Sequence, residues 1–145
     1  MLFCYFYAII TLGDFFMLNR SELREKIMTI LYQINLFKDS KISYNIDEII
    51  KENVNIENEF VKDIVYGVTT YYDELCELAN EYLVDWTIDR LDSTGRTILL
   101  MGLYELKYTE TPDIVVINEA LDLANKYSSE NVRKMINAVL DKVRE

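Results

Sequence analysis

The sequence predicts an all-α protein folded as a single domain, and three observations support this prediction. Half of the 145 residues are hydrophobic, and only four are glycine and one is proline, a composition that favours long helices over a turn-rich β fold. Apolar residues recur at spacings of three and four along most of the chain. Residues that can cap helix N-termini precede several of these runs. A chain of this length is expected to bury about two-thirds of the surface that its unfolded form exposes.

Residues 1–16, MLFCYFYAIITLGDFF, form an apolar extension before the predicted domain, residues 17–145. The uninterrupted apolar run is too short to span a bilayer, which needs about 20 residues. The segment also lacks the basic region and the small-residue cleavage site of a secretory signal. Two interpretations stay open: either the start codon is misread and Met17 is the true start, or a real extension docks on an apolar groove or a partner. An intact-mass measurement on the native protein decides between them.

The first helix is predicted over residues 20–37, where Asn19 can cap the N-terminus and Glu22 has the spacing of a capping box. Its expected buried face consists of Leu23, Ile27, Ile30, Leu31 and Ile34. Arg20, Arg24 and Lys26 are expected to project away from that face. A loop and a short helix over residues 47–52 follow.

A single long helix is then predicted from Asn58 to Tyr82, because apolar residues continue at helical spacing over its whole length. Gly67 lies inside this helix and costs about 1 kcal/mol relative to alanine, which indicates close backbone packing. Trp86 and Ile88 are expected to cover the core as the chain turns.

The central element is the stretch 97–124, TILLMGLYELKYTETPDIVVINEALDLA, which predicts two apolar helices joined by a turn. The first has hardly any polar face, so it is expected to be buried on most sides. Asp92, Ser93 or Thr94 can cap it. The only proline of the chain, Pro112, lies in the connector, where it marks a boundary between helices. A last helix is predicted from about Ser129.

The net charge of −10 is unevenly distributed. Residues 20–38 carry four basic and two acidic side chains, and residues 126–145 carry five basic and three acidic ones. Residues 39–125 carry six basic and nineteen acidic side chains. The chain is therefore an acidic body with two mildly basic ends, and an acidic body repels nucleic acid unless its basic elements meet on one face. The alternative interpretation is that the acidic surface serves only solubility.

The sequence offers little for catalysis. It contains no histidine, which removes the usual general base and the commonest zinc ligand together. Two cysteines are too few for a disulfide framework and lack metal-ligand spacing. Phosphate-binding loops and nucleophile elbows are also missing from the sequence. We therefore expect a protein that binds, without enzymatic activity and without a cofactor or metal.

The segments LYEL (103–106), INEALDLANKY (117–127) and INAVLDKV (136–143) resemble the signature of the NusB family of bacterial transcription antitermination factors. The resemblance covers residues 20–144. It implies an all-α fold of two three-helix bundles packed roughly perpendicular. It also implies a cytoplasmic protein without catalytic activity that binds boxA-type single-stranded RNA. The implied partner is a ribosomal small-subunit protein that doubles as NusE, and the pair joins the antitermination complex on RNA polymerase.

The resemblance also implies site residues. The family's RNA surface is formed by an arginine-rich first helix and the start of the last helix, the two regions that the charge count finds basic. The RNA-binding residues implied in this chain are Arg20, Arg24, Lys26, Asn131, Arg133, Lys134 and Met135. The residues implied to face the ribosomal protein are Tyr32, Gly95 and Arg96.

The chain departs from the family at several of these positions. Members commonly have three or more basic residues where this chain has Arg20, Ser21 and Glu22, and an aromatic where Met135 stands. An acidic–basic pair commonly begins the central helix, where this chain has Gly95 and Arg96. RNA affinity is therefore expected to depend strongly on the protein partner. Two alternatives stay open: a helical interaction module that has lost RNA binding, and a fragment of an RNA methyltransferase, against which the end of the chain at Glu145 argues.

Overall fold

The computed structural model describes residues 18–144, and this part of the chain contains helices and no strands. The seven α-helices and one short 3₁₀ helix of the described part are α2 (Arg20–Asp39), α3 (Ile46–Asn53), α4 (Glu59–Thr70), α5 (Tyr72–Tyr82), η1 (Ile88–Arg90), α6 (Ser93–Tyr108), α7 (Asp113–Tyr127) and α8 (Glu130–Val143). The predicted all-α class is confirmed. No helix in this part is both long enough and apolar enough to cross a membrane. The extension 1–16 lies outside the described residues.

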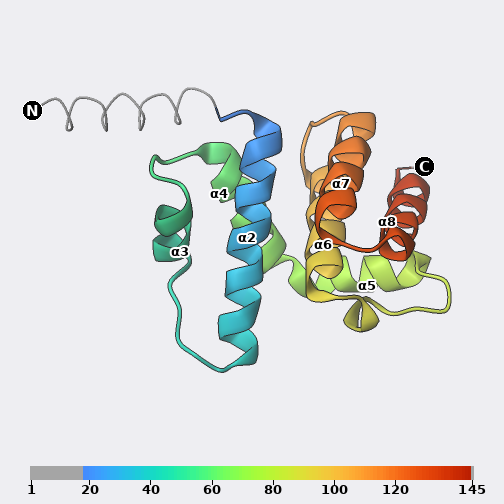
Figure 1. Cartoon of the computed structure of the whole chain (residues 1–145), viewed down its shortest axis with the longest axis horizontal. Helices are drawn as coiled ribbons and strands as arrows, with labels where there is room; N and C mark the ends of the chain where they lie inside the picture. The colour runs from blue at the N-terminus through green and yellow to red at the C-terminus, as the bar shows by residue number, and fades with distance from the viewer. Residues whose placement is uncertain (1–17, 145) are drawn as a thin grey trace, which may run out of the picture.

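The helices form two groups of three on either side of the molecule (Figure 1). Helices α2, α3 and α4 make one group, and α6, α7 and α8 make the other, while α5 runs across the ends of α6 and α8. Helix α6 is the hub, because it packs against α2, α4, α5, α7 and α8. This position explains why the sequence of α6 has hardly any polar face, as predicted: nearly every residue from Gly95 to Glu105 is buried.

Helix starts were predictable because they depend on local chemistry. The side chains of Asn19, Asn58, Asp92 and Ser129 each accept a hydrogen bond from a backbone N–H in the first turn of the following helix. Such caps satisfy donors that have no partner within the helix and contribute about 1 kcal/mol each. The predicted starts of α2, α4, α6 and α8 are thereby confirmed.

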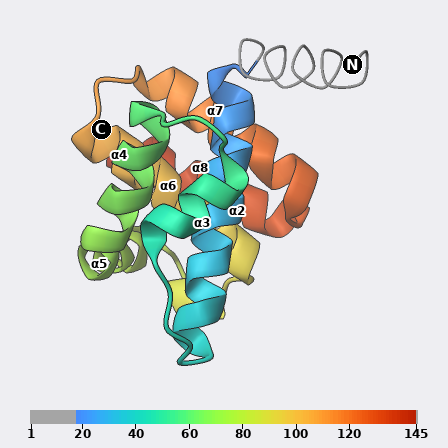
Figure 2. The same cartoon turned by 90° about the vertical axis from the view of Figure 1, so that its left-hand side faces the viewer.

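The predicted long helix from Asn58 to Tyr82 is wrong, because the chain breaks at Tyr71 into α4 and α5. Tyr71 has φ −98° and ψ 20°, outside the helical range, and α5 leaves α4 in a new direction (Figure 2). The break lets α5 pack on α6 and α8. Apolar spacing continues across the break, so periodicity alone could not reveal it. The expectation for Trp86 is also wrong: Trp86 is exposed, while Ile88 is buried as expected.

Candidate nucleic-acid interface

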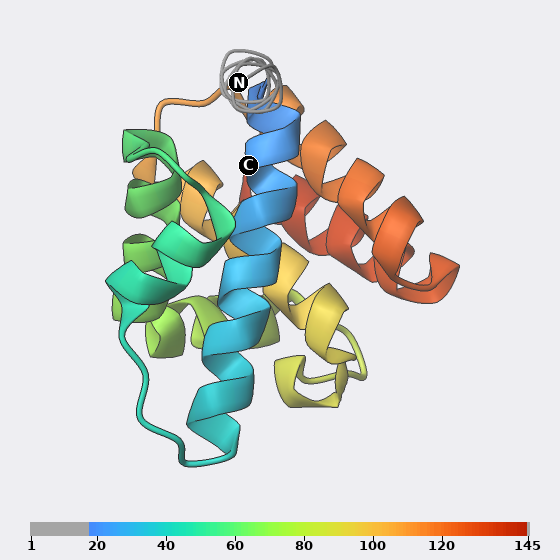
Figure 3. The ribbon, with the colours of Figure 1, turned by 60° about the vertical axis from the view of Figure 1, so that its left-hand side comes forward.

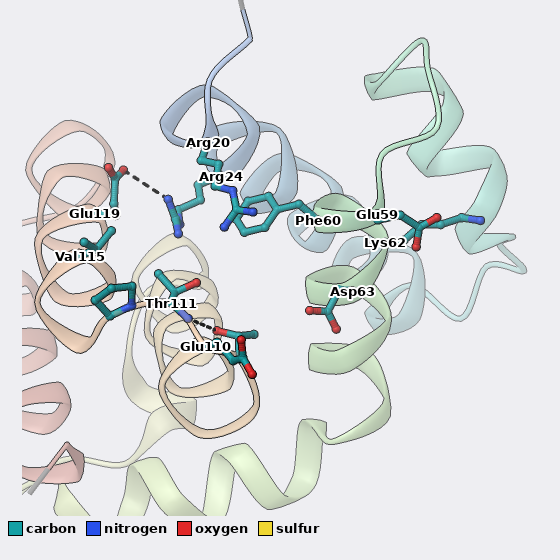
Figure 4. Close-up of a pocket in the computed structure, with 12 residues that line it drawn as sticks. Arg20, Arg24, Glu59, Phe60, Lys62, Asp63, Glu110, Thr111, Val115 and Glu119 are labelled. Atoms are coloured by element: carbon teal, nitrogen blue, oxygen red, sulfur yellow. Dashed lines mark hydrogen bonds and ion pairs between the residues drawn. The ribbon is translucent and has the colours of Figure 1, made fainter.

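A groove opens between the start of α2, the start of α4 and the connection from α6 to α7 (Figure 4). Its volume is about 1070 Å³. Its charged lining is mixed, with Arg20, Arg24 and Lys62 facing Glu59, Asp63, Glu110 and Glu119. Phe60, Pro112 and Val115 supply apolar walls. The groove therefore presents two arginines at the α2 end, and carboxylates together with Lys62 along α4 and the α6–α7 connection.

The side chain of Arg24 was expected to project from α2, and this expectation is wrong. Arg24 is 3% exposed and donates from Nε and Nη2 to the two carboxylate oxygens of Glu105, both at 2.8 Å. A second carboxylate, Glu119 on α7, lies 4.0 Å from Nη1 and accepts a 2.7 Å hydrogen bond from the Ser21 hydroxyl. A buried guanidinium is satisfied only by such pairing. Arg24 thus ties α2 to α6 and α7 and is not displayed for a phosphate.

The other two predicted cations of α2 are exposed. The guanidinium of Arg20 lies over the ring of Phe60, 4.6 Å from its centroid, at the mouth of the groove. Lys26 lies on the outward side of the helix, away from the buried residues Arg24 and Ile27. Both side chains carry charge that solvent and a phosphate backbone can reach.

Glu25 connects the first half of α2 to the end of α7. Its Oε1 accepts a 2.7 Å hydrogen bond from Lys126 Nζ and a hydrogen bond from the Tyr127 hydroxyl. These hydrogen bonds, first that from Lys126 and then that from Tyr127, hold the pKa of Glu25 below its ordinary value. The hydrogen bond to Glu25 in turn raises the pKa of Lys126. The exposed Tyr127 ring is therefore held beside Lys126, whose Nζ lies 5.5 Å from the ring centroid.

Helix α8 begins three residues after Tyr127, and Ser129 caps it. Asn131 and Lys134 are exposed, whereas Arg133 and Met135 are partly buried. The start of α8 packs on the start of α6: a Cβ added at Gly95 would lie 2.5 Å from a methyl group of Val132. The two predicted basic regions, residues 20–38 and 126–145, meet where Lys126 and Tyr127 donate hydrogen bonds to Glu25. They are neighbours through α7, whose end reaches Glu25 and leads into α8 (Figure 3).

The three residues expected to face a protein partner differ from one another in exposure to solvent. Tyr32 on α2 is 39% exposed, and Arg96 is partly buried in the first turn of α6. Gly95 is buried beneath Val132, so its lack of a side chain serves helix packing and it offers no contact surface of its own. Among the described residues, Arg96 Nε is the buried side-chain polar atom without a hydrogen-bond partner.

The sequence of this fold matches the family model described as the NusB family over residues 21–145. The chain belongs to the NusB family. A Pediococcus pentosaceus protein named transcription antitermination protein NusB is 43% identical over 129 residues, which cover 87% of this chain and 97% of that protein. The Staphylococcus aureus protein of the same name is 37% identical over 130 residues, covering 88% of this chain and 100% of the relative.

Solved NusB-family structures have the same fold. The T. maritima NusB structure has a TM-score of 0.75 and 25% identity, covering 88% of this chain and 91% of that chain. A crystal structure of the antitermination factors NusB and NusE in complex with double-stranded RNA has a TM-score of 0.72 and 28% identity. In that case the match covers 86% of this chain and 95% of the other.

Tyr127 is a candidate site residue that sequence reasoning missed. It lies within a segment that resembles the family, but whether it can contact a ligand depends on where the fold places its ring. The structure exposes 44% of Tyr127 at the junction between α7 and α8, next to Lys126 and across from α2. An exposed ring next to lysines has the composition of a single-strand binding surface, where cations track phosphates and aromatic rings stack on bases. A tyrosine between a lysine and the two serines that separate α7 from α8 was the available signal.

Proposed function

We propose that this NusB-family protein is a transcription antitermination factor that binds boxA-type single-stranded RNA together with the ribosomal small-subunit protein NusE. It acts in the cytoplasm on the RNA polymerase elongation complex, by binding and without catalysis. Family membership supports the proposal. The proposed RNA site rests on one observation: two regions with exposed cations, the first turns of α2 and the α7–α8 junction, are neighbours.

Within this site we assign the phosphate contacts to Arg20 and Lys26 on α2 and to Arg133 and Lys134 on α8. Exposed ammonium and guanidinium groups release counterions when they neutralise phosphates, and this release drives binding at low salt. Tyr127, Met135 and Asn131 are the groups available for bases, by stacking or by hydrogen bonding. Arg24 takes a positioning role, because its pairing with Glu105 holds the first turns of α2 in place.

The protein partner is assigned to the surface that includes Tyr32 and Arg96. The partner NusE is a ribosomal protein, and proteins that bind ribosomal RNA are typically basic. The acidic body of this chain, with nineteen carboxylates and six basic side chains between residues 39 and 125, complements such a partner electrostatically. RNA then meets a joint surface to which the partner contributes much of the positive charge.

A binding titration tests the proposal. Labelled boxA-type RNA is titrated with the protein, with and without NusE, at two salt concentrations. The wild-type protein is expected to bind more tightly with NusE present. In Lys26→Ala and Lys134→Ala, affinity should fall and the slope of log K against log salt should flatten by about 0.7 for each phosphate that is no longer neutralised. Lys51→Ala is the matched control, because Lys51 is an exposed lysine on α3, outside residues 20–38 and 126–145.

A second candidate function is a helical interaction module that keeps the protein partner but has lost RNA binding. Burial of Arg24 favours it, since this leaves fewer displayed cations on α2 than the family's arginine-rich helix implies. In that case NusE binds normally, and RNA binding shows the same salt slope in Lys26→Ala, Lys134→Ala and Lys51→Ala. That outcome would remove RNA recognition from the proposal.

A further inference from the structure

A cluster of tyrosines lies where the α4–α5 break meets the last turns of α6, and none of these tyrosines is among the residues proposed to contact RNA or NusE. The cluster adjoins the groove through Asp63, which lines it. The rings of Tyr71 and Tyr108 stack with centroids 4.6 Å apart and planes 13° apart. The ring of Tyr104 stacks on Tyr108 at 5.3 Å. We call Tyr71, Tyr104 and Tyr108, together with Asp63, Glu74 and Lys107, the tyrosine surface. Tyr71 and Tyr108 are 40% and 38% exposed, so two stacked aromatic rings face solvent.

Contacts with α4 hold the tyrosine rings of this surface in position. Gly67 of α4 leaves the space that the Tyr104 ring occupies, since an added Cβ would lie 2.0 Å from Tyr104 Cζ. The Tyr104 hydroxyl donates a 2.7 Å hydrogen bond to Asp63 Oδ1. Burial and this hydrogen bond raise the pKa of Tyr104, so the hydroxyl remains a donor. The break in the helix at Tyr71 then places its ring on Tyr108.

Carboxylates surround the exposed rings. Glu74 Oε1 accepts from Lys107 Nζ at 2.6 Å and from the Tyr108 hydroxyl at 2.7 Å, which leaves Oε2 for a further donor. Asp63 is exposed and uses Oδ1 for Tyr104, which leaves Oδ2. One cation already lies over a ring of this cluster: Lys107 Nζ is 5.6 Å from the Tyr108 ring centroid. Two carboxylates against one ammonium make this surface unfavourable for RNA.

We propose that the tyrosine surface docks an arginine-rich segment of a protein partner. A guanidinium stacks on an aromatic ring and donates several hydrogen bonds in its own plane, so it can use an exposed tyrosine face and a neighbouring carboxylate together. The hydroxyls of Tyr104 and Tyr108 are already bonded, and Tyr71 stacks on Tyr108, so these rings lose little conformational freedom on binding and make effective contact residues. The negative charge of the rim provides the electrostatic complement for such a segment.

Peptide titrations with the full chain test this proposal. The probes are two labelled peptides of equal length and charge, one of repeated Arg-Gly-Gly units and one of repeated Lys-Gly-Gly units. General attraction to an acidic protein treats the two alike, whereas ring stacking favours arginine. The wild-type protein is expected to prefer the arginine peptide by about two- to fivefold. The Tyr71→Leu/Tyr108→Leu double variant keeps apolar bulk but should bind both peptides equally.

Tyr66→Leu is the matched control, because Tyr66 is also exposed on α4 and its hydroxyl also donates to a carboxylate, that of Asp47. It should keep the arginine preference. Amide chemical shifts in the wild-type protein provide a second readout that needs no variant, and the arginine peptide should perturb Tyr71 and Tyr108. An equal affinity of the wild-type protein for both peptides, an unchanged preference in the double variant, or perturbations centred on the groove would each overturn the proposal.

Titration of the double variant with boxA-type RNA separates this proposal from the proposed function. RNA binding should stay at the wild-type level in Tyr71→Leu/Tyr108→Leu, because neither tyrosine is among the residues proposed to contact RNA. A loss of RNA binding in this variant would assign the tyrosine surface to RNA and remove the arginine-rich partner.

Discussion

Arg24 and Glu105, 81 residues apart in the sequence, form a bidentate ion pair that is buried between α2 and α6. Glu119 of α7 approaches the same guanidinium and also holds Ser21. These contacts join the first turns of α2 to the second group of helices. The exposed cations Arg20 and Lys26 lie on those turns, so a buried structural pair determines the position of the charges that we propose contact RNA.

Glu105→Ala is expected to destabilise the protein by about 3–5 kcal/mol, because it leaves the Arg24 charge buried without its partner. Urea unfolding followed by circular dichroism measures the change. Replacing both residues, as in Arg24→Met/Glu105→Leu, should recover much of the loss, since two apolar side chains of similar volume need no pairing.

The matched control for this prediction is Glu57→Ala, which removes an ion pair with Lys62 on the surface. Exposed pairs of this kind contribute little, so the urea midpoint should stay at the wild-type value. Equal midpoints for Glu105→Ala and the wild-type protein would contradict the assigned role of Arg24.

The link between Glu25 and α7 predicts a specific acid sensitivity. The pKa of Glu25 is lowered in the folded protein, first by the hydrogen bond from Lys126 and then by that from Tyr127, so below the ordinary value of 4.5 the unfolded chain binds more protons at this site. The stabilisation from Glu25 is therefore fully present at neutral pH and is lost as the pH falls below that value.

Glu25→Gln removes this titration. The difference in urea midpoint between the wild-type protein and Glu25→Gln is expected to be largest at pH 7 and to shrink steadily in buffers below pH 4.5. Other carboxylates titrate in both proteins and cancel in the difference. A difference that stays constant over this range would show that Glu25 gains nothing from Lys126 and Tyr127.

Sequence alone predicted the features that short stretches of chain decide. The caps at Asn19 and Asp92 depend on residues three positions away, and the burial of α6 follows from its continuous apolar pattern. The break at Tyr71 depends on how α5 packs against α6 and α8, which no local pattern encodes. A helical period that continues through a break conceals it.

The site was predictable as two basic regions but not in its details. Lys26 and Lys134 are exposed to solvent, as their positions on the polar faces of amphipathic helices predict. Arg24 is a basic residue on the same helix as Lys26, yet its partner, Glu105, is remote in sequence, so spacing could not distinguish a buried ion pair from a phosphate contact. Tyr127 gains its position from Glu25, again a contact between distant segments.

Gly67→Ala tests the contact between α4 and α6. Alanine favours helix formation by about 1 kcal/mol over glycine, so an open site would be stabilised. Here the added methyl group would overlap the Tyr104 ring, whose hydroxyl is bonded to Asp63, and overpacking of this kind costs about 1–3 kcal/mol. We expect a net loss of stability in urea. Combining Gly67→Ala with Tyr104→Leu should reduce the penalty, and a simple gain in stability would contradict the close approach.

Met135→Phe is expected to tighten RNA binding. Met135 is partly buried against the core in the second turn of α8. Stacking of a base on an aromatic ring is worth about 1–3 kcal/mol, and an added ring at the edge of a binding surface should yield about three- to tenfold in affinity. Met135→Leu is the matched control, because it keeps an apolar side chain of similar volume without a ring. Affinity for boxA-type RNA in the presence of NusE should rise for phenylalanine only, and equal affinities for the two variants would mean that no base lies over this part of α8.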